Sequence, residues 1–497
     1  MTNKNKKFYI TTSIPYTNAP PHIGFALEAI QADVLARYHK CLGEDVFFLT
    51  GTDEHGIKTL RVAREAGRDP KDFADGISGK FRELTKILNI SNNDFIRTTD
   101  ETKHKPAVEK LWKKLDEAGD IYKKKYKGYY CPGCEAFKTE KEIVDGKCPI
   151  HLKELEFVEE ENYFFRLSKY TKEVEEKIRS GEIEIIPESR KNETLSMLKQ
   201  GMEDVSFSRT KDKYWGFEVP GDPEQVMYVW CDALPNYISA IGYDNETEQF
   251  KKYWPADVHC LGKDIMKFHT IFWPAMLLSA KLALPKKIFV HGFINVGGQK
   301  MSKSLGNVVD PFELVNKYGV DAVRYYLLRE IVSAEDGDFT YEKFEQRYNA
   351  DLAGGIGNLV ARTLGISDKI SNFEFRISNK FSNLELKKQI EKTQKNYKLA
   401  IESFKFNEAL ISVWEIISFC DKYINEEKLW ETPSTSSGQA KKMEVINDLF
   451  FAIKEIGILL EPFLPQTSEK IKKVVEKPFD SAQGRSEILF PRLENKK

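Results

Sequence analysis

The chain has 497 residues, too many for one hydrophobic core, so we expect two to four domains. A hydrophobic content of 41% excludes an intrinsically disordered chain, and no apolar run reaches the roughly 18–20 residues of a membrane span. A formal net charge of −1 means that any nucleic-acid partner must be held by local basic patches. The N-terminus lacks the apolar stretch of a signal peptide, and seven cysteines, four of them in one cluster, do not suggest disulfides. We therefore expect a cytoplasmic protein.

The first fifty residues predict a strand, a helix and a second strand. "KKFYITTSI" is rich in β-branched and aromatic residues and ends near Pro15. Apolar residues recur at helical spacing after Gly24, and "DVFFLTG" reads as a short buried strand. Later, "ADVHCLG" and "KKIFVHGF" predict two buried strands, with the helical "FHTIFWPAMLLSAKL" between them. This alternation is typical of an α/β protein with a parallel sheet.

Two other regions differ from this pattern. Residues 117–212 are charged and carry the clustered cysteines, so we interpret them as an insertion between two halves of one sheet. From about residue 340 onward no strand is predicted, and the sequence from 386 to 430 is typical of successive amphipathic helices. We therefore expect a helical bundle at the C-terminal end.

Two short motifs suggest how the sheet is used. In an open α/β sheet, ligands bind beyond the carboxyl ends of the strands, and a helix N-terminus there favours phosphate. In "PHIG", Gly24 lets a ligand approach the backbone and His22 can donate to phosphoryl oxygens, although a tight turn with a surface histidine explains the motif equally well. In "GGQKMSKSLGN", Lys300 and Lys303 can neutralise a departing pyrophosphate, although such a loop is often only solvated.

Together the two motifs resemble the paired signatures, usually written HIGH and KMSKS, of class I aminoacyl-tRNA synthetases. The second stands at residues 300–304 letter for letter. Further segments resemble the methionyl-tRNA synthetases in particular: "SIPYTNAPPHIG", "FLTGTDEHG", "CPGC…CPIH", "VWCDALPNYISA", "GKDIMKFHTIFWPAMLL" and "RYNADLAGGIGNLVAR".

The resemblance implies a fold and its domains. We expect an α/β protein with a Rossmann-like parallel-sheet catalytic domain that is split by a zinc-binding connective insertion and followed by an α-helical bundle anticodon-binding domain. The expected parts are the first half of the catalytic domain (1–116), the insertion with its zinc knuckle (117–212), the second half with the KMSKS loop (213–335), a stem-contact or linker region (336–365) and the anticodon-binding bundle (366–497).

The implied activity is that of a methionine–tRNA ligase in protein biosynthesis. The methionine carboxylate attacks the α-phosphate of ATP, which is expected to carry Mg²⁺, to give methionyl-adenylate and pyrophosphate. Methionine then passes to the 3′ end of tRNA(Met). The resemblance implies catalytic roles for His22, Lys300 and Lys303. It implies ATP binding by His22, Gly24, Lys303, Asp264 and His291.

Methionine requires an anion for its ammonium and an aromatic, mostly dry pocket for its thioether. The resemblance assigns the ammonium to Asp53 and gives the pocket to Ser13, Ile14, Tyr16, Trp230, Ala233, Leu234, Tyr237, Ile265 and His269. A hydroxyl on Tyr237 or a ring N–H on His269 would offer the sulfur a weak hydrogen bond. Without the resemblance, these aromatic residues would be read as ordinary core.

The sequence departs from the family at Phe25, where a second histidine normally contacts ATP. Loss of one transition-state donor costs on the order of 10²–10³ in rate. Phe25 therefore predicts reduced activity, or activity compensated by backbone N–H groups, His22 or Lys303. A harmless replacement on a partly buried helix turn is the alternative.

Four residues with the spacing C-x2-C-x13-C-x2-H predict a metal site. Cys131, Cys134, Cys148 and His151 can converge tetrahedrally on one structural Zn²⁺ per chain, and reduced thiols without a metal are the alternative. Some methionyl-tRNA synthetases carry such a single knuckle. The remaining cysteines, Cys41, Cys231, Cys260 and Cys420, are expected to be buried.

Single-stranded RNA is read by aromatic stacking and by hydrogen bonds to base edges. By resemblance, Asn358 and Arg362 contact anticodon bases and Trp430 offers a stacking face, although Trp430 could be core and Arg362 could be a salt-bridge partner. Lysines in "YKKKYKG" could touch the tRNA acceptor stem or form a solvated face. No dimerisation domain follows the bundle, so we expect a monomer.

Two other functions stay open on the sequence. Another class I synthetase is less favoured, because leucyl-type enzymes need a larger editing insertion than residues 117–212, and a cysteinyl enzyme needs an open zinc position in its substrate pocket. A non-catalytic RNA-binding paralogue, with Phe25 marking the loss of chemistry, is opposed by the presence of His22, Asp53 and the whole KMSKS sequence.

Overall fold

The computed structural model describes residues 6–131, 136–138, 143–149, 152–212, 214–301, 306–368, 381–431, 435–476 and 489–494. It divides into two compact units. The first comprises Met1–Ala32, His39–Lys86 and Ile90–His291, and the second comprises Asp33–Tyr38, Ile87–Asn89 and Gly292–Lys497. Among the described helices, none is long and apolar enough to cross a membrane.

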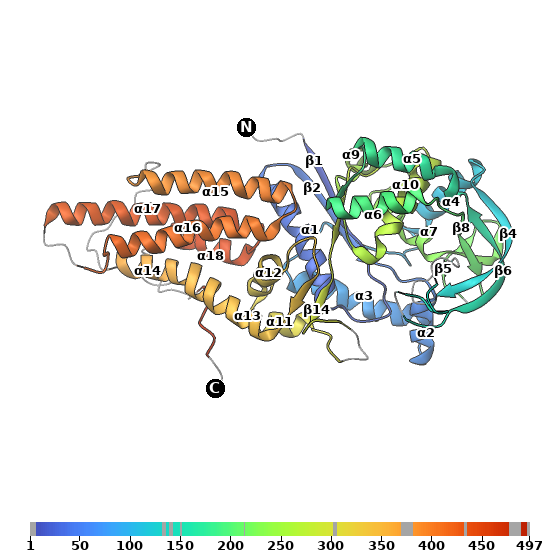
Figure 1. The fold of residues 1–497 in the computed structure, drawn as a ribbon, viewed down its shortest axis with the longest axis horizontal. Coiled ribbons are helices and arrows are strands. Elements are labelled where there is room, and N and C mark those ends of the chain that lie inside the picture. Colours follow the sequence, from blue (N-terminus) through green and yellow to red (C-terminus); the bar gives the residue numbers. More distant parts are fainter. Residues whose placement is uncertain are drawn as a thin grey trace. The chain divides into compact units, whose positions relative to one another are not determined.

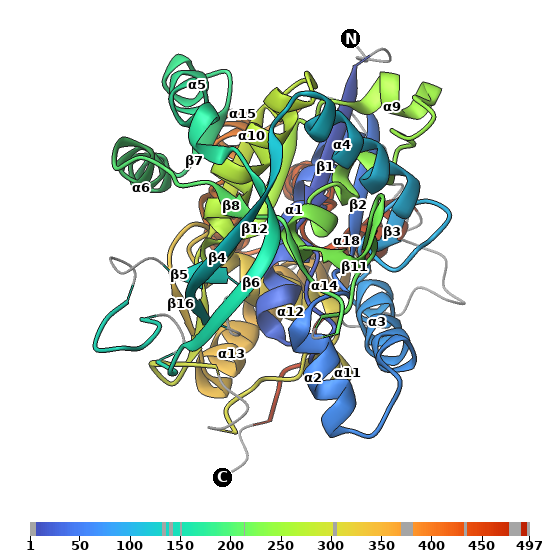
Figure 2. The ribbon, with the colours of Figure 1, turned by 90° about the vertical axis from the view of Figure 1, so that its right-hand side faces the viewer.

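A six-stranded parallel sheet forms the centre of the first unit, in the order β3-β2-β1-β12-β13-β7. Its strands are β1 (Lys7–Thr12), β2 (Asp45–Thr52), β3 (Asp94–Arg97), β7 (Glu184–Ile186), β12 (Val258–Gly262) and β13 (Lys287–His291). The strand order reverses between β1 and β12, which is where open α/β sheets bind ligands. The predicted parallel sheet is confirmed, and Figure 2 shows β1, β2 and β12 side by side.

The helices of this unit follow the strands in chain order. They are α1 (Ile23–Cys41), α2 (Ile57–Glu65), α3 (Pro70–Ile87), α4 (Lys105–Glu117), α5 (Leu167–Ser180), α6 (Glu188–Lys199), α7 (Val229–Ala233), α8 (Asn236–Ser239), α9 (Glu248–Tyr253) and α10 (Trp273–Ser279). The 3₁₀ turn η2 (Lys263–Ile265) and the π-helical η3 (Phe268–Phe272) precede α10, so the helix predicted over 268–282 is α-helical only in its second part.

The inserted region contains a long antiparallel hairpin of β4 (Ile121–Cys131) and β6 (Glu156–Phe165), with β5 (Ala136–Lys138) and β8 (Val205–Ser206) at its sides. Three further short strands, β9 (Ser208–Thr210), β10 (Glu218–Val219) and β11 (Asp222–Met227), pair with one another. Figure 2 shows the hairpin crossing the face of the unit that is turned to the viewer. β7 lies within the predicted insertion but pairs with β13 at the edge of the central sheet, so the chain rejoins that sheet before residue 212.

The second unit is mainly helical. Its short strands β14 (Ile294–Val296), β15 (Gln299–Lys300) and β16 (Gly337–Phe339) form one small sheet. Its helices are α11 (Pro311–Tyr318), α12 (Val320–Arg329), α13 (Tyr341–Arg347), the π-helical η5 (Tyr348–Gly357), α14 (Asn358–Ser367), α15 (Leu384–Glu402), α16 (Phe406–Glu426), α17 (Ser436–Leu460) and α18 (Pro465–Glu476).

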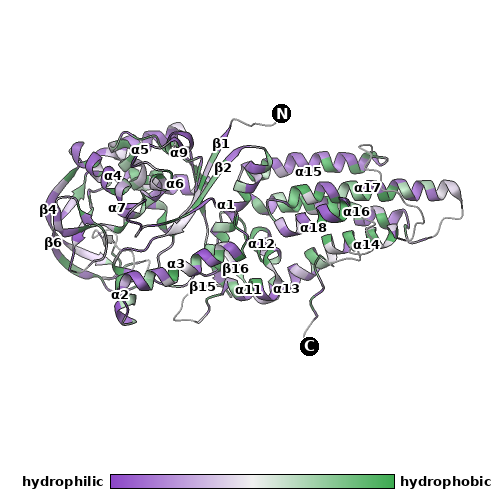
Figure 3. Cartoon of the chain, turned by 180° about the vertical axis from the view of Figure 1, so that it is seen from behind, coloured by the Kyte–Doolittle hydropathy of each residue, from purple (hydrophilic) through white to green (hydrophobic). Residues whose placement is uncertain are grey.

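The predicted C-terminal bundle is confirmed, because α15, α16, α17 and α18 pack side by side (Figure 1). Figure 3 shows hydrophobic and hydrophilic residues along each of these helices, as expected where one face is buried. The buried residues of α16 include Leu410, Val413, Ile417 and Ile424. Of the cysteines that we expected to be buried, Cys231, Cys260 and Cys420 are buried, but Cys41 is exposed because it ends α1 at the surface.

Candidate active site

The predicted ligand-binding residues of the first unit follow the carboxyl ends of neighbouring strands. Ser13 follows β1, Asp53 follows β2, and His291 is the last residue of β13. Asp264 lies in η2, directly after β12. Because parallel strands end at the same edge of a sheet, the fold gathers residues that are far apart in the sequence.

Glu28, which sequence reasoning missed, ties two of these strand ends together. Its buried carboxylate accepts hydrogen bonds from the backbone N–H and the hydroxyl of Ser13, both at 2.7 Å. The other carboxylate oxygen lies 2.9 Å from Nε2 of His291. An acidic residue inside the apolar helix α1 was the available signal, because buried carboxylates need such partners.

His22 stands directly before α1 with a defined tautomer. The backbone N–H of Gly24 donates to Nδ1 of His22 at 3.0 Å, so in the neutral ring Nε2 carries the proton and is the free donor. Although part of the ring reaches solvent, the surrounding protein lowers the pKa of His22, and the nearby Asp264 carboxylate opposes that shift. His22 is therefore a neutral hydrogen-bond donor at pH 7 and lies near Asp264.

Phe25 points into the protein from the first turn of α1. Its side chain is 8% exposed and meets Phe81 of α3 edge to face, with ring centroids 5.0 Å apart. This is a favourable arrangement for two aromatic rings. The position that carries a second histidine in the family is therefore a packing position in this chain.

Asp53 is buried immediately beyond β2 and pairs with Tyr16 in an isolated parallel bridge. The N–H of Asp53 donates to the carbonyl of Pro15 at 2.9 Å. A glycine is needed just before it, because a Cβ at Gly51 would lie 2.1 Å from the carbonyl oxygen of Ile96. The loop that carries Asp53 is thus held close to both neighbouring strands.

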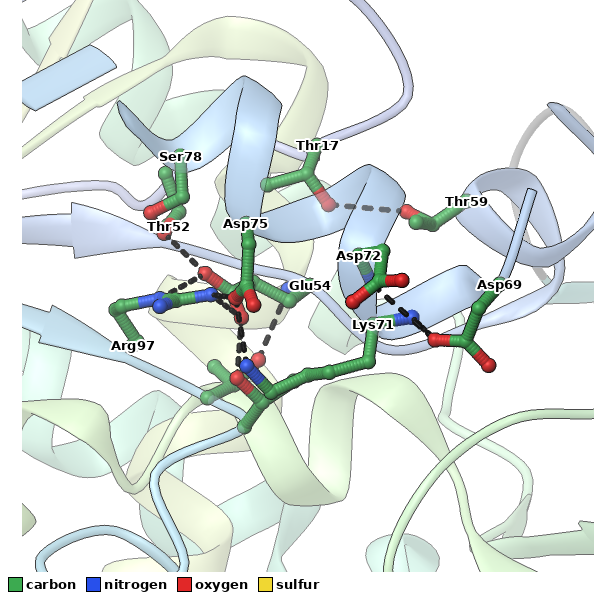
Figure 4. A network of polar contacts seen from close by, with 12 residues as sticks. Thr17, Thr52, Glu54, Thr59, Asp69, Lys71, Asp72, Asp75, Ser78 and Arg97 are labelled. Atoms are coloured by element: carbon green, nitrogen blue, oxygen red, sulfur yellow. Dashed lines mark hydrogen bonds and ion pairs between the residues drawn. The ribbon is translucent and has the colours of Figure 1, made fainter. Parts of the chain in front are cut away.

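The next residue, Glu54, is the centre of a polar network (Figure 4). Arg97 at the end of β3 donates to both carboxylate oxygens of Glu54, at 2.6 and 2.9 Å. Thr52 and Thr99 also donate to this carboxylate, and Asp75 pairs with Arg97 on its other side. The predicted site did not include this network, which fixes the backbone beside Asp53.

Aromatic side chains gather beside Asp53, and we call Trp230, Tyr237, Phe268 and His269 the aromatic cluster. Trp230 stacks on Phe268 with centroids 3.8 Å apart and an interplanar angle of 7°. Tyr16, the bridge partner of Asp53, meets Trp230 edge to face at 6.3 Å. The structure brings the predicted methionine-binding residues together, and it adds Phe268, which sequence reasoning missed.

The hydrogen bonds inside the aromatic cluster fix which atoms donate. His269 lies 3.0 Å from the carbonyl oxygen of Ile265 through Nδ1, so Nδ1 carries the proton and Nε2 is an acceptor. The Tyr237 hydroxyl, 2.7 Å from Nε2, therefore donates to His269. Burial lowers the pKa of His269 to about 4, so the ring is neutral at pH 7. In this arrangement both donors that we expected to face a thioether already have partners.

The remaining predicted methionine-binding residues surround these groups. Ala233 and Leu234 are buried at the end of α7, and Ile14 and Ile265 are half-buried against the same core. Tyr237 is further fixed because its carbonyl oxygen accepts a hydrogen bond from the hydroxyl of Tyr9 at 2.6 Å.

Three of the other predicted ATP and metal ligands fall outside the described residues: Lys303, Cys134 and His151. Lys300 is exposed on β15 in the second unit, with its ammonium 5.3 Å from the ring centroid of Phe293. Cys131 and Cys148 are buried. Within the described ranges, no group of three or more His, Cys, Asp or Glu side chains is placed to hold a metal ion.

The predicted RNA-binding residues lie in the second unit. Asn358 begins α14, and Arg362, one turn later, donates to Asn425 at 2.8 Å and to Asp421 at 3.4 Å. Trp430 is 55% exposed, so the core alternative for Trp430 is wrong, whereas Arg362 does form the ion pair that we considered.

The lysine run of β4 belongs to the first unit. Lys123 pairs with Asp222 at 2.8 Å, and Lys127 pairs with Glu159 at 2.9 Å. Because these two charges are already matched, the run is better explained as a solvated, ion-paired strand than as an RNA contact.

Comparisons with known proteins agree on one family. A model described as "tRNA synthetases class I (M)" matches residues 8–156 and 144–364, and one described as "Anticodon-binding domain of tRNA ligase" matches residues 383–492. A methionine–tRNA ligase of Caldanaerobacter subterraneus is 44% identical over 99% of this chain and 80% of its own length. One from Thermotoga maritima is 45% identical over 95% of this chain and 76% of its own length.

Solved structures give the same result. A structure of Mycobacterium tuberculosis methionyl-tRNA synthetase in complex with methionyl-adenylate matches with a TM-score of 0.92 at 37% identity, and the match covers 98% of this chain and 100% of that one. The apo form from the same organism matches with a TM-score of 0.83 at 34% identity.

Proposed function

This chain belongs to the class I methionyl-tRNA synthetases, and we infer from this membership that it is a methionine–tRNA ligase. It activates methionine with ATP and transfers the methionyl group to tRNA. The leucyl and cysteinyl enzymes considered from the sequence are not favoured, because the curated relatives and the solved structures reported above are all methionyl enzymes.

One observation carries the assignment of the amino-acid site. A buried carboxylate, Asp53, lies beside the aromatic cluster, and Tyr16 contacts both. An α-amino acid with an apolar, polarisable side chain satisfies both parts, because its ammonium pairs with the carboxylate and its thioether packs against aromatic rings. Ser13, Ile14, Ala233, Leu234 and Ile265 complete this proposed site.

In the activation step, a carboxylate oxygen of methionine attacks the α-phosphorus of ATP. A new P–O bond forms, the bond to the bridging α–β oxygen breaks, and pyrophosphate leaves with that electron pair. No side chain needs to act as a nucleophile, so the chain contributes alignment and charge stabilisation. Nε2–H of His22 is the proposed donor to phosphoryl oxygens, with Gly24 leaving room for the nucleotide.

The other proposed nucleotide contacts come from both units. Asp264 and His291 lie near the ribose and adenine, while Lys300 and Lys303 neutralise the departing pyrophosphate. Mg²⁺ bound to ATP supplies additional positive charge to the phosphates. A Cβ at Gly262 would lie 3.0 Å from Oδ1 of Asp264 and 3.7 Å from Nε2 of His291, which supports their shared location.

In the transfer step, the terminal ribose hydroxyl of tRNA attacks the carbonyl carbon of methionyl-adenylate and AMP leaves. The helical second unit is proposed to recognise the anticodon through Asn358, Arg362 and Trp430. The exposed Trp430 ring supports this role, since single-stranded bases stack on exposed aromatic faces.

A structural zinc ion is also proposed for the inserted region. The donor chemistry of Cys131 and Cys148 fits zinc, both side chains are buried, and the chain around Cys148 forms a tight turn closed by bridges from Lys147 to Val144 and to Glu154. Cys134 and His151 would complete the set. Metal analysis of the purified protein is expected to give one zinc per chain, and Cys148→Ser is expected to lower that content.

A cytoplasmic location and a monomeric state also stay predictions from the sequence. Sedimentation velocity checks the second one. A single species near the 57.3 kDa mass of the chain is expected, and a stable dimer would contradict it.

The deciding experiment is amino-acid-dependent ATP–pyrophosphate exchange with methionine, cysteine, leucine or no amino acid. We expect exchange with methionine alone. Absence of exchange from folded, metal-loaded protein would overturn the enzymatic function and favour the RNA-binding paralogue. The variant Phe25→His, assayed in parallel, would show whether that position limits the rate.

A further inference from the structure

Asp232 lies in α7 between Trp230 and Ala233 and is fully buried. Its side chain is placed between two histidines from distant parts of the chain. Nδ1 of His55 lies 2.7 Å from Oδ2, and Nε2 of His104 lies 3.3 Å from Oδ1. A buried carboxylate with two histidine partners is costly to build, so its location beside the aromatic cluster calls for a reason.

The hydrogen-bond pattern defines this cluster further. Nε2 of His104 donates to the carbonyl oxygen of Asp232 at 3.0 Å, and Nδ1 lies 2.8 Å from the hydroxyl of Ser239 in α8. Burial alone would raise the pKa of Asp232, but His55 and His104 offset that effect and lower it. Asp232 is therefore ionised and accepts hydrogen bonds at neutral pH, and α7 and α8 are both fixed to His104.

His55 connects this cluster to the proposed ammonium site. It follows Asp53 by two residues, and its ring packs edge to face on Trp215 and Phe217, with centroids 4.9 and 4.7 Å away. Glu54, between Asp53 and His55, is held by Arg97 (Figure 4). The Asp53 loop is thus anchored on one side to β3 and on the other, through His55 and Asp232, to α7.

We propose that Asp232 is a positioning residue for the amino-acid substrate, which sets the distance between the Asp53 carboxylate and the wall formed by Trp230, Ala233 and Leu234. This proposal rests on the proposed function. An amino acid must place its ammonium and its side chain at the same time, so a shift of either wall weakens binding although no direct contact is lost. Misplacement by about 1 Å can change rates by up to about a hundredfold.

The test compares Asp232→Ala with Asp232→Asn, which keeps an oxygen acceptor for His55. We expect Asp232→Ala to raise the KM for methionine in pyrophosphate exchange by about ten- to a hundredfold, with the KM for ATP unchanged. Asp232→Asn is expected to raise it less. Methionine binding without ATP, followed by tryptophan fluorescence, should show the same order in Kd. Equal KM and Kd for methionine in wild type and both variants would overturn the proposal.

A matched control is Asp120→Ala. Asp120 is also a fully buried carboxylate with several partners (Tyr170, Ser279 and Lys169), but these lie on α5 and α10 and not in the proposed site. Its loss should lower stability without changing the Kd for methionine. An equal rise of Kd in this control would reduce Asp232 to a structural role.

Two further outcomes separate this proposal from the proposed function. If Asp232→Ala does not fold, as judged by circular dichroism, Asp232→Asn carries the test, and an unchanged Kd in that variant overturns the proposal. If wild type binds methionine but catalyses no exchange, only the enzymatic function fails. If wild type does not bind methionine, the proposed function and the role of Asp232 fail together.

Discussion

At the scale of single residues, the proposed site is defined by where protons and side chains are held. His22 and His269 each have one ring nitrogen fixed by a backbone group, so the free nitrogen of His22 is a donor and that of His269 an acceptor. The same residue type thus takes opposite roles at the two ends of the substrate site. Sequence reasoning located both histidines but assigned no tautomer, because that depends on backbone groups within 3 Å.

Phe25 gives the first prediction at this scale. Replacement by histidine should destabilise the protein by about 1–3 kcal/mol, because a polar ring would replace one half of a buried aromatic pair. Urea unfolding monitored by circular dichroism measures this change. Phe25→Leu, which removes the ring without adding a polar group, is the control and should cost less. A Phe25→His variant as stable as wild type would show that Phe25 does not contribute through packing.

His269 gives a prediction for the effect of pH. Its pKa is about 4 in the folded protein against an ordinary 6.5, so between these values the unfolded chain binds more protons than the folded one. The free energy of unfolding is therefore complete above pH 6.5 and decreases as the pH falls toward 4, by about 3 kcal/mol from this group.

The measurement compares wild type with His269→Gln. Other buried histidines titrate with the same sign, so the difference between the two proteins isolates His269. That difference should shift in favour of His269→Gln as the pH decreases from 6.5 to 4. A difference that stays constant over this window would contradict the prediction.

At the scale of elements, the proposed site depends on how η3 faces α7. The sequence predicted one continuous helix over this segment, but its start is π-helical, which sets Phe268 against Trp230 and His269 against Tyr237. Phe268→Ala should raise the KM for methionine about tenfold, since loss of a stacked ring costs about 1.5 kcal/mol, and should leave the KM for ATP unchanged. Phe268→Tyr keeps the ring and should behave as wild type. An equal change in both KM values would indicate a general disturbance instead.

Elements also show what the sequence could and could not predict. β1, β2, β12 and β13 were predicted because buried parallel strands are continuous apolar runs, and α1 because its apolar residues follow helical spacing. β7 was not predicted, since three residues within a charged region carry no such pattern. The contacts of Glu28 and Asp232 join segments more than 170 residues apart, so only the fold reveals them.

At the scale of the whole molecule, the two units have separable tasks in the proposed function. The residues proposed for methionine lie in the first unit, and those proposed for the anticodon lie in the second. Activation of methionine does not require tRNA, so a defect in anticodon recognition should affect only the transfer of methionine to tRNA.

Arg362→Gln tests this separation. Asn425 and Asp421 orient the Arg362 guanidinium, whose fork can bind a base edge, and loss of such a contact costs about 1–3 kcal/mol. We therefore expect kcat/KM for tRNA to fall by about ten- to a hundredfold in aminoacylation, while pyrophosphate exchange stays at the wild-type rate. Lys392→Gln, which removes an exposed cation from α15 of the same unit, is the control for net charge and should leave both reactions unchanged. If both variants lowered aminoacylation equally, the second unit would attract tRNA by charge alone and Arg362 would not read a base.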